Sequence, residues 1–313
     1  MGSIGVGATA MSMVCRTSAT PRHLRNCQYP NSGFRRTDHE RYGVCDECEI
    51  GGDIVTTPAR QVLVAGDWHG NANWGTTLVR EARKLGVSTI LQLGDFGIWT
   101  RRQTNAYLDS LETVAERSTV DIYAIGGNHE NYDDVEAFER HRDDGGFVPL
   151  RQHVRWVPRG HRWTWDGVRF GGLGGAFSVD WRTRMPGRTW WPYKEELHDE
   201  DVERLGEAPL DVLVTHEAPA GMEPPSPFKL ARQTDERARL TRARILRAMR
   251  RAHPALVLHG HWHLRQSMVV EDHDGHVFRI EGLASDQEAN GTSWGVLDLA
   301  TLELRDGTSL GGA

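Results

Sequence analysis

The sequence predicts an α/β fold in which two β-sheets pack face to face and helices cover the outer sides. Three observations indicate this fold. Between residues 61 and 141, apolar strand-like runs alternate with amphipathic helical runs, which is typical of a largely parallel sheet. After residue 160, strand-like runs follow one another with few helices, which indicates a second sheet. The early strands also end in glycine followed by a polar residue, and parallel sheets bind ligands at these carboxyl ends.

The first half of the chain is expected to contain three strands, each followed by a helix. The first strand is Gln61–Ala65, and the helix after it spans Thr76–Leu85 and ends at Gly86. The remaining strands and helices of this half are expected, in order, at residues 88–93, 106–117, 120–127 and 135–141.

The second half is expected to begin with a hairpin at residues 161–175, because Asp166–Gly167 is a typical two-residue turn. A strand at Pro209–Thr215 and a helix at Glu236–Arg251 follow. Turns at residues 273–275 and near 286–291 separate further strands. These strands are expected at residues 255–260, 265–272, 276–284 and 294–300.

The helix at residues 236–251 is rich in arginine, which raises the question of whether it binds RNA or an acidic partner. We favour an ordinary amphipathic helix that buries Leu240, Leu246 and Met249 and leaves its charged side chains in solvent.

Residues 1–58 differ from the rest of the chain, since they are polar and lack a sustained apolar period. We interpret them as a flexible leader, followed by one domain at residues 59–313. All 4 cysteines lie in this leader, and Cys45 and Cys48 could form half of a zinc site. Cys15 and Cys27 do not form a second C-x-x-C pair, so free thiols are the preferred interpretation.

The composition is that of a soluble globular protein, with 38% hydrophobic and 26% charged residues. A net charge of −6 argues against bulk nucleic-acid binding. No apolar run approaches the ~20 residues that cross a membrane, and the N-terminus lacks a signal-peptide pattern. We therefore expect a cytoplasmic protein, while the sequence does not predict its oligomeric state.

Polar side chains with metal-binding chemistry follow five of the expected strands. Every one of them stands at the carboxyl end of an apolar run, and a set ordered in this way rarely arises by chance. The residues are Asp67 and His69, then Asp95, then Asn128 and His129, then His216, and finally His261 and His263.

This mixture of carboxylate, imidazole and amide donors suits borderline divalent ions. Seven ligands are too many for one tetrahedral site but suit two ions that share a bridging group. Two ions about 3.5–4 Å apart can stabilise both the attacking and the leaving oxygen of a phosphoryl displacement. Asp95 is the candidate bridge, because one carboxylate offers two oxygens.

The order D-x-H, G-D, G-N-H-E, H and G-H-x-H resembles the calcineurin-like metallophosphoesterase family, over about Gln61 to Ala284. The resemblance implies a four-layer α/β/β/α sandwich with two mixed sheets. It also implies a metal-dependent phosphoesterase that hydrolyses phosphomonoesters or phosphodiesters. The substrate would be a phosphoester, with nucleotides among the candidates. Two divalent ions are implied as cofactors, with Mn²⁺ expected and Fe, Zn or Ni as alternatives.

The resemblance also implies a role for each motif residue. A hydroxide that bridges the two ions would attack phosphorus in line. His129 would contact the phosphate and protonate the leaving oxygen, oriented by Glu130 or another acid, so that His129, Asp95 and Asn128 are the catalytic residues. The implied ligands are Asp67, His69 and His263 for the first metal, Asp95 as the bridge, and Asn128, His216 and His261 for the second metal.

One stretch departs from the family pattern. Many relatives carry G-D-x-x-D, often followed by arginine, whereas this chain has GDFGIW with Ile98 in place of the second acid. The protein Ser/Thr phosphatase branch of the family uses that stretch for phosphate recognition. Its absence argues against that branch, and phosphate contacts must come from elsewhere in the chain.

The segment Gly172–Pro192 is the expected source of substrate contacts, because it joins glycines to arginines and tryptophans. Arginine binds phosphate and indole rings stack on bases. We weigh a cap over the metals against a surface loop whose tryptophans pack locally. The candidate substrate-binding residues are Arg182, Arg184 and Arg188, accompanied by Trp181, Trp190 and Trp191.

Other classes of function are less well supported. The chain lacks the G-x-S-x-G elbow of serine hydrolases and the P-loop of nucleotide-binding proteins. A noncatalytic interaction protein on a metallophosphoesterase scaffold, joined to partners through the leader, is the main alternative. Such a protein would be expected to lack ligands, whereas all seven and His129 are present. A sequence-specific nucleic-acid binder lacks a recognition motif.

Overall fold

A computed structural model describes residues 61–225, 230–286 and 292–307 of the chain. The predicted leader at residues 1–58 and its cysteines lie outside the described residues. Among the residues that are described, no helix has the length and apolarity to cross a membrane.

The first sheet has seven strands in the described part of the chain, in the order β13-β12-β1-β2-β3-β5-β4. Its four central strands run parallel, and β12, β13 and β4 add antiparallel edges, so the sheet is mixed. The strands are β1 (Gln61–Ala65), β2 (Thr89–Gln92), β3 (Asp121–Ala124), β4 (Val148–Pro149), β5 (Val154–Trp156), β12 (Trp294–Asp298) and β13 (Leu304–Asp306).

The second sheet has six strands within the described ranges, in the order β10-β11-β9-β8-β7-β6. Strands β11, β9, β8 and β7 run parallel, and the two outer strands pair antiparallel with their neighbours. The strands are β6 (Arg162–Trp165), β7 (Val168–Leu173), β8 (Val212–Thr215), β9 (Leu256–His259), β10 (Gln266–Glu271) and β11 (Val277–Gly282).

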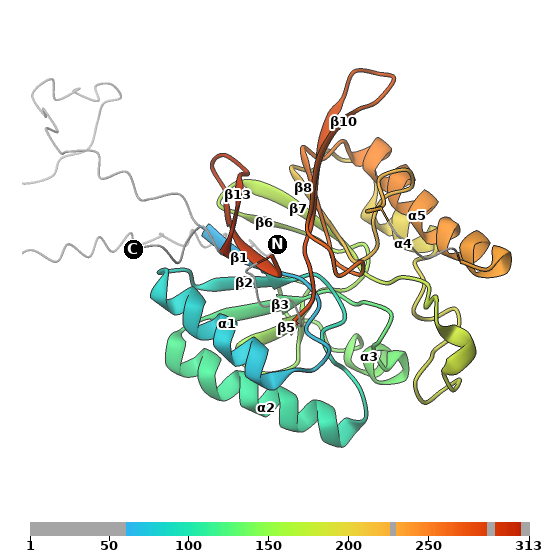
Figure 1. The fold of residues 1–313 in the computed structure, drawn as a ribbon. Helices are drawn as coiled ribbons and strands as arrows, with labels where there is room; N and C mark the ends of the chain where they lie inside the picture. The colour runs from blue at the N-terminus through green and yellow to red at the C-terminus, as the bar shows by residue number, and fades with distance from the viewer. Residues whose placement is uncertain (1–60, 226–229, 287–291, 308–313) are drawn as a thin grey trace, which may run out of the picture. The chain divides into compact units, whose positions relative to one another are not determined.

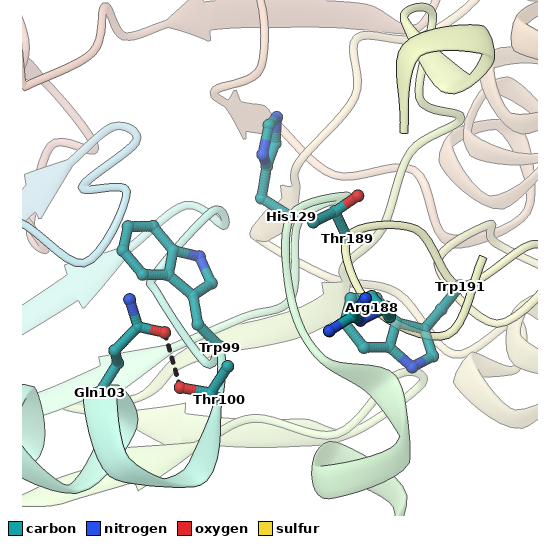
Figure 2. A pocket seen from close by; sticks show the side chains of 7 residues that line it. All are labelled: Trp99, Thr100, Gln103, His129, Arg188, Thr189 and Trp191. Carbon is teal, nitrogen blue, oxygen red and sulfur yellow. Dashed lines mark hydrogen bonds between the residues drawn. The ribbon is translucent and has the colours of Figure 1, made fainter. Parts of the chain in front are cut away.

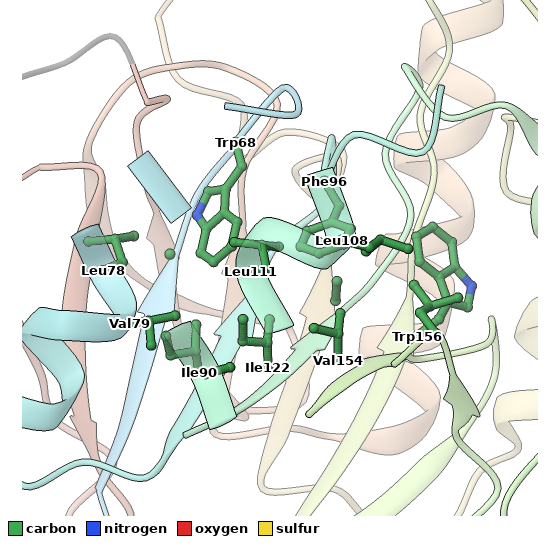
Figure 3. Close-up of a cluster of buried hydrophobic side chains, with 14 of the residues drawn as sticks. Trp68, Leu78, Val79, Ile90, Phe96, Leu108, Leu111, Ile122, Val154 and Trp156 are labelled. Carbon is green, nitrogen blue, oxygen red and sulfur yellow. The ribbon is translucent and has the colours of Figure 1, made fainter. Parts of the chain in front are cut away.

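Helices cover the outer face of each sheet (Figure 1). Helices α1 (Ala72–Lys84) and α2 (Arg101–Ser118) contribute to one apolar cluster with the first sheet. Helices α4 (Asp199–Leu205) and α5 (Arg232–Ala252) contribute to another with the second sheet. A third cluster joins side chains of the two sheets. This four-layer arrangement confirms the predicted α/β/β/α sandwich. Figure 3 shows part of the first cluster, where Trp68 and Phe96 lie near the strand ends.

The helices begin earlier than predicted, because their first turns carry no regular apolar period. Helix α1 starts at Ala72 rather than Thr76, since Asn71 caps it by accepting a hydrogen bond from the Trp74 amide. Helix α2 starts at Arg101, and α3 spans Tyr132–Phe138 after Asn131, which caps it in the same way. The short elements β4, β5, β13 and α4 were not predicted, because two to seven residues carry too little periodicity.

Helix α5 corrects one sequence prediction. Met249 is buried and Leu246 is partly buried, but Leu240 is 52% exposed. The face toward the sheet is formed instead by small residues together with Ile245, which is completely buried.

The arginines of α5 are mostly paired with acids, which argues against a nucleic-acid surface on this helix. Seven of these arginines form such pairs, and in six of the pairs the nitrogen–oxygen distance lies between 2.6 and 3.3 Å. The pairs are Arg232–Glu236, Arg237–Glu196, Arg239–Asp235, Arg242–Glu217, Arg244–Asp199, Arg247–Asp199 and Arg251–Glu203.

The burial of α5 gives a testable contrast between two aliphatic residues. Ile245→Ala should lower the free energy of unfolding by roughly 2–5 kcal/mol, because it leaves a cavity against the second sheet. Leu240→Ala, on the exposed face, should change it by no more than about 0.5 kcal/mol. Urea denaturation followed by circular dichroism measures both values. Equal losses in the two variants would contradict this packing of α5.

Candidate metal centre

Parallel pairing brings the carboxyl ends of five strands to one region of the molecule. In the first sheet, the last residues of β1, β2 and β3 are register partners, Ala65 with Gln92 and Gln92 with Ala124. In the second sheet, β8 and β9 pair in the same parallel sense. The motif residues predicted from the sequence follow directly after these five strands. They therefore enter one space from both sheets, although the motifs are far apart in the chain.

Four of the predicted ligands have a left-handed backbone. The φ angle is 45° at His69, 51° at Asp95, 67° at His261 and 54° at His263. Residues other than glycine rarely adopt positive φ, and each such residue costs on the order of 1 kcal/mol or more. The surrounding structure must therefore hold these turns in place, and strain of this kind is typical of functional sites.

Asp95 lies at the centre of the cluster and is only 1% exposed. Its Oδ2 lies 3.5 Å from His69 Nε2 and 3.8 Å from His129 Nε2. Its Oδ1 lies 3.4 Å from His216 Nε2 and accepts hydrogen bonds from the Asn128 and His129 amides at 2.8 and 2.9 Å. The two oxygens thus face different sets of donors, as a bridging carboxylate requires.

Asp67 is completely buried beside this group. Its Oδ1 accepts a hydrogen bond from the His261 amide at 3.0 Å and lies 4.0 Å from His216 Nδ1. Its Oδ2 lies 3.0 Å from His263 Nε2, yet it has no partner with hydrogen-bond geometry in the described part of the chain. A buried carboxylate oxygen without a hydrogen bond is costly unless a cation satisfies it.

The donor atoms of this cluster fit divalent cations. In the described residues, three groups of ligand atoms each lie within 4.8 Å of one another. Asp67 and Asp95 are shared between groups, which links them into one centre of oxygen and nitrogen donors. The groups are Asp67 with His69 and His263, His69 with Asp95 and His129, and Asp67 with Asp95 and His216.

The carboxylates make the centre attractive to positive charge. Burial opposes ionisation of Asp95, but the neighbouring His129 and His216 hold its pKa well below the usual range. Burial likewise opposes the charge on the histidines, yet Asp95 and Asp67 raise the pKa of His69 to about 9 and that of His216 to about 10. The same negative potential would favour a divalent ion at this position.

Asn128 and His261 both contact His216, although His261 belongs to none of the three groups of ligand atoms. Asn128 Oδ1 lies 3.2 Å from His216 Nε2, so the amide oxygen faces the cluster. His261 packs beside the His216 ring at a centroid distance of 5.0 Å, and its Nε2 lies 3.6 Å from Glu217 Oε2. Burial lowers the pKa of His261 to about 4, which keeps its imidazole neutral.

Glu130 has a different position from the one implied by the family resemblance. It is completely buried and accepts hydrogen bonds from the Gly97 amide at 3.2 Å and the Gly127 amide at 2.6 Å. Burial raises its pKa to about 7. Glu130 therefore ties the loops after β2 and β3 together. The polar neighbours of the His129 ring are Asp95 and Arg184 instead.

Asp286 is a member of the site that sequence reasoning missed. Its Oδ1 lies 3.1 Å from His69 Nδ1, and its Oδ2 accepts a hydrogen bond from Asn71 at 2.8 Å. Its amide donates to the Asp67 carbonyl at 2.8 Å. A carboxylate behind a ligand histidine fixes the ring orientation. The sequence around Asp286 resembles only a polar turn, and no motif marked it.

Arg184 reaches the site from the segment that was expected to cap it. Its guanidinium Nη2 lies 2.6 Å from His129 Nε2, and its Nη1 donates to the Asn128 carbonyl at 3.2 Å. Asp180 holds the side chain by an ion pair of 2.7 Å. Burial and Arg184 lower the pKa of His129, and Asp95 opposes them.

The other two arginines of that segment have different surroundings. Arg182 lies over the Trp181 ring, 4.8 Å from its centroid, and donates to Gln233 at 3.3 Å. Arg188 instead lines a cavity that also contacts His129. Trp181 and Trp190 pack against each other with centroids 5.3 Å apart. Part of the segment thus packs locally, and part of it faces the site.

The cavity next to His129 has a volume of about 310 Å³. Figure 2 shows Trp99 on one side of it and Arg188 and Trp191 on the other, with the His129 ring beside them. Its lining residues are Trp99, Thr100, Gln103, His129, Arg188, Thr189 and Trp191.

A buried acid supports the loop that holds Asn128. Glu195 Oε1 accepts hydrogen bonds from the Ser178 amide and from Trp190 Nε1, each at 3.0 Å, while its buried Oε2 has no partner among the described residues. Ser178 Oγ in turn accepts a hydrogen bond from the Asn128 side chain at 3.2 Å. Burial raises the pKa of Glu195 to about 7, although hydrogen bonds from Ser178 oppose the shift.

Comparisons with known proteins identify the family and the fold of the chain. The family model described as calcineurin-like phosphoesterase matches residues 60–265. The solved structure of TT1561 from Thermus thermophilus aligns with a TM-score of 0.51 and 14% identity, covering 80% of this chain and 98% of that chain. A dimetal phosphatase from Danio rerio aligns with a TM-score of 0.44 and 14% identity, covering 77% and 93%. Among curated proteins, none matches the sequence.

The raised pKa of Glu195 predicts a pH-dependent change in stability. The folded state keeps its proton up to about pH 7, whereas the reference value is 4.5, so the folded state binds more protons between these values. Wild-type stability should therefore fall across this range relative to Glu195→Gln. Urea unfolding should show that the advantage of the variant grows by roughly 1–3 kcal/mol between about pH 5 and pH 8.

The control for this measurement is Glu200→Gln, which changes an exposed acid in a nearby segment. Its pH profile should run parallel to that of the wild type. If the Glu195→Gln profile is also parallel, Glu195 does not hold a proton in the folded protein.

Proposed function

The chain belongs to the calcineurin-like phosphoesterase family, and we propose that it is a metal-dependent phosphoesterase acting at the cluster described above. One observation carries the proposal. Two buried carboxylates, Asp67 and Asp95, converge with histidines from both sheets, and one carboxylate oxygen lacks a hydrogen-bond partner in the described part of the chain. Donor sets of this kind bind divalent ions that catalyse phosphoryl transfer.

We assign the ligands from the motifs and the donor groups together. Asp67, His69 and His263 would hold one ion, with Asp95 shared, and Asp286 would orient the His69 ring. The second ion would be held by Asp95 and by a group from the loops after β3, β8 and β9. The mixed oxygen and nitrogen donors suit Mn²⁺, Fe, Zn and Ni, and of these we propose Mn²⁺. The residues of that second group are Asn128, His216 and His261.

The bound ions would supply Lewis acidity that polarises the phosphoryl group and generates a nucleophile from water. The chain's own residues would bind and orient the ester. Arg184 is placed to hold a phosphate oxygen, because its guanidinium Nη2 lies next to the proposed acid, 2.6 Å from His129 Nε2. Arg184 would thus supply a phosphate contact in place of the stretch around Ile98. Ile98 itself cannot contact phosphate, since it is completely buried in the apolar cluster of the first sheet.

His129 is the proposed general acid. With no oxygen between them, the protonated imidazole and Arg184 would repel each other. A phosphate oxygen that replaces their direct contact would accept from both nitrogens once the two side chains have moved apart, and its charge would favour the imidazolium. His129 then transfers its Nε2 proton to the leaving oxygen as the phosphorus–oxygen bond breaks.

The alternative is a noncatalytic interaction protein on the same scaffold. The catalytic proposal is favoured because five of the seven motif ligands gather in the donor groups described above and a cavity adjoins His129, as a bound ester requires. The substrate is a phosphomonoester or a phosphodiester, and a nucleotide is compatible with the aromatic cavity wall.

A phosphoester panel after chelation tests the proposal. The protein is stripped with a chelator and assayed with Mn²⁺, Ni²⁺, Zn²⁺ or Mg²⁺ on p-nitrophenyl phosphate, its bis ester and a 2′,3′-cyclic nucleotide. We expect hydrolysis to disappear on chelation and to return with Mn²⁺ for at least one ester. Asp95→Asn should not recover, because it removes the shared ligand. Hydrolysis that is indifferent to the chelator would contradict the metal mechanism.

His129→Ala separates proton transfer from metal binding. Its kcat should fall by about 10²–10⁴-fold on alkyl esters, whose leaving oxygen needs a proton. The loss in kcat should be smaller for p-nitrophenyl esters, because p-nitrophenolate can leave without being protonated. Metal content, measured by plasma mass spectrometry, should stay at the wild-type level. The exposed His141→Ala is the matched control. Loss of metal together with activity would mean that His129 is a ligand and not the acid.

A further inference from the structure

We propose that the cavity beside His129 binds a planar aromatic ring carried by the leaving group of the substrate. The ring is part of a nucleobase or of a simple aryl group, and both share a flat π-surface. This inference rests on the proposed function, because it places the leaving oxygen next to His129. It adds what the proposed function leaves open, which is the chemical class of the ester.

The size of the cavity sets the scale of its ligand. A volume of about 310 Å³ lies at the lower end of the range for small-molecule pockets, which begins at about 300 Å³. The cavity therefore accommodates one ring system with a short linker. It is too small for a folded macromolecule, and its two tryptophans favour an apolar, flat occupant.

One wall of the cavity is Trp99, which makes contacts through both its backbone and its ring. The Trp99 amide donates to Thr104 Oγ1 at 2.8 Å, and the Trp99 carbonyl accepts from Asn131 at 3.1 Å. The indole packs on Gly70, where an added Cβ would lie 3.1 Å from the ring. The backbone of Trp99 is thus held by two hydrogen bonds and its indole rests on Gly70, which favours stacking with a planar ring.

The opposite wall comes from the segment after β7. Trp191 is buried, and its Nε1 donates to Asp133 Oδ2 on α3 at 3.0 Å, so this indole is also fixed. Thr189 Oγ1 accepts a hydrogen bond from the Met185 amide at 2.8 Å, which orders the turn that carries Arg188. Two fixed aromatic walls leave little freedom to lose when a ring enters between them.

Arg188 lines this cavity, and its positive charge has no ion-pair partner in the described part of the chain. Within the described residues, no carboxylate lies within ion-pair distance of its guanidinium, whereas Arg184 is paired with Asp180. Its side chain is exposed. Arg188 can therefore donate hydrogen bonds to acceptor atoms on the bound ring. A nucleobase offers such acceptors and a phenyl ring does not, so the two ligand sources differ in their need for Arg188.

His129 connects this cavity to the reaction, because it both lines the cavity and faces Asp95. In the proposed step, an oxygen from water forms a bond to phosphorus and the bond from phosphorus to the leaving oxygen breaks. The His129 proton goes to that oxygen, which leaves as an alcohol. The aromatic part of this alcohol would lie in the cavity, between Trp99 and Trp191.

Two pairs of esters test the cavity with the leaving chemistry held constant. Adenosine 5′-monophosphate is compared with ribose 5-phosphate, and benzyl phosphate with ethyl phosphate. Within each pair, both leaving groups are primary alcohols and only one carries an aromatic ring. In the wild-type enzyme with Mn²⁺, we expect kcat/KM to favour the aromatic member by at least roughly five-fold, as one stacking contact allows.

The variants assign this preference to named residues. Trp99→Leu should abolish it in both pairs, and Trp99→Phe, which keeps a ring, should retain most of it. Arg188→Ala should reduce it for the nucleotide pair alone if the ring is a nucleobase, and leave the benzyl pair unchanged. The control Arg239→Ala, an exposed arginine on α5, should leave both preferences at the wild-type level. Equal rates within both pairs, or a preference that survives Trp99→Leu, would overturn the inference.

A binding measurement distinguishes failure of this inference from failure of the proposed function. If no ester in either pair is hydrolysed under any metal condition, and neither are the bis ester and the cyclic nucleotide of the panel above, the proposed function is wrong. Calorimetric titration of adenosine and of benzyl alcohol into wild type and Trp99→Leu then tests the cavity by itself. Binding that weakens at least roughly five-fold in Trp99→Leu supports the cavity assignment. Absence of binding of both alcohols to the wild type overturns it.

Discussion

The site depends on one constraint, which is the burial of two carboxylates within one small space. Asp67 and Asp95 are 0% and 1% exposed, and like charges in a medium of low polarity require compensating positive charge. Histidines from both sheets surround them, and the raised pKa values of His69 and His216 reflect the same negative potential. Divalent ions would neutralise this potential and satisfy the Asp67 oxygen that lacks a partner with hydrogen-bond geometry in the described part of the chain, so the proposed metal binding accounts for features that are unusual in an ordinary polar core.

The backbone around these carboxylates is built for close approach. A Cβ at Gly127 would lie 2.0 Å from Asp95 Oδ1, and a Cβ at Gly260 would lie 2.3 Å from Asp67 Oδ1. Glycine thus has a direct function in the G-N-H and G-H-x-H motifs, because any side chain there would displace a carboxylate. The left-handed turns at His69 and Asp95 also contribute to this close approach, since they turn the backbone so that both side chains enter the common space.

The sequence predicted the parts of the structure that repeat a regular pattern. The strands that carry the motifs were predicted because their apolar runs stop abruptly, four of the five before a glycine, and their parallel order explains why distant motifs meet. Asp286 could not be predicted, because its contact with His69 spans 217 residues and no local pattern marks it. Similarly, the sequence shows three arginines in one segment but does not predict which of them reaches the site. Only the packing shows that Arg184 lies beside His129, whereas Arg182 lies over the Trp181 ring. The exposed Leu240 shows the same limit, because a helix rich in arginine has more than one plausible apolar face.

The most direct test of the account is to locate metal ions by anomalous diffraction from crystals grown with Mn²⁺. The account predicts two peaks per chain, about 3.5–4 Å apart. Asp95 should lie within coordination distance of both peaks, with Asp67 bound to one of them and His216 to the other. One peak, or peaks that do not touch Asp95, would contradict the proposal that the two carboxylates form a shared binuclear centre.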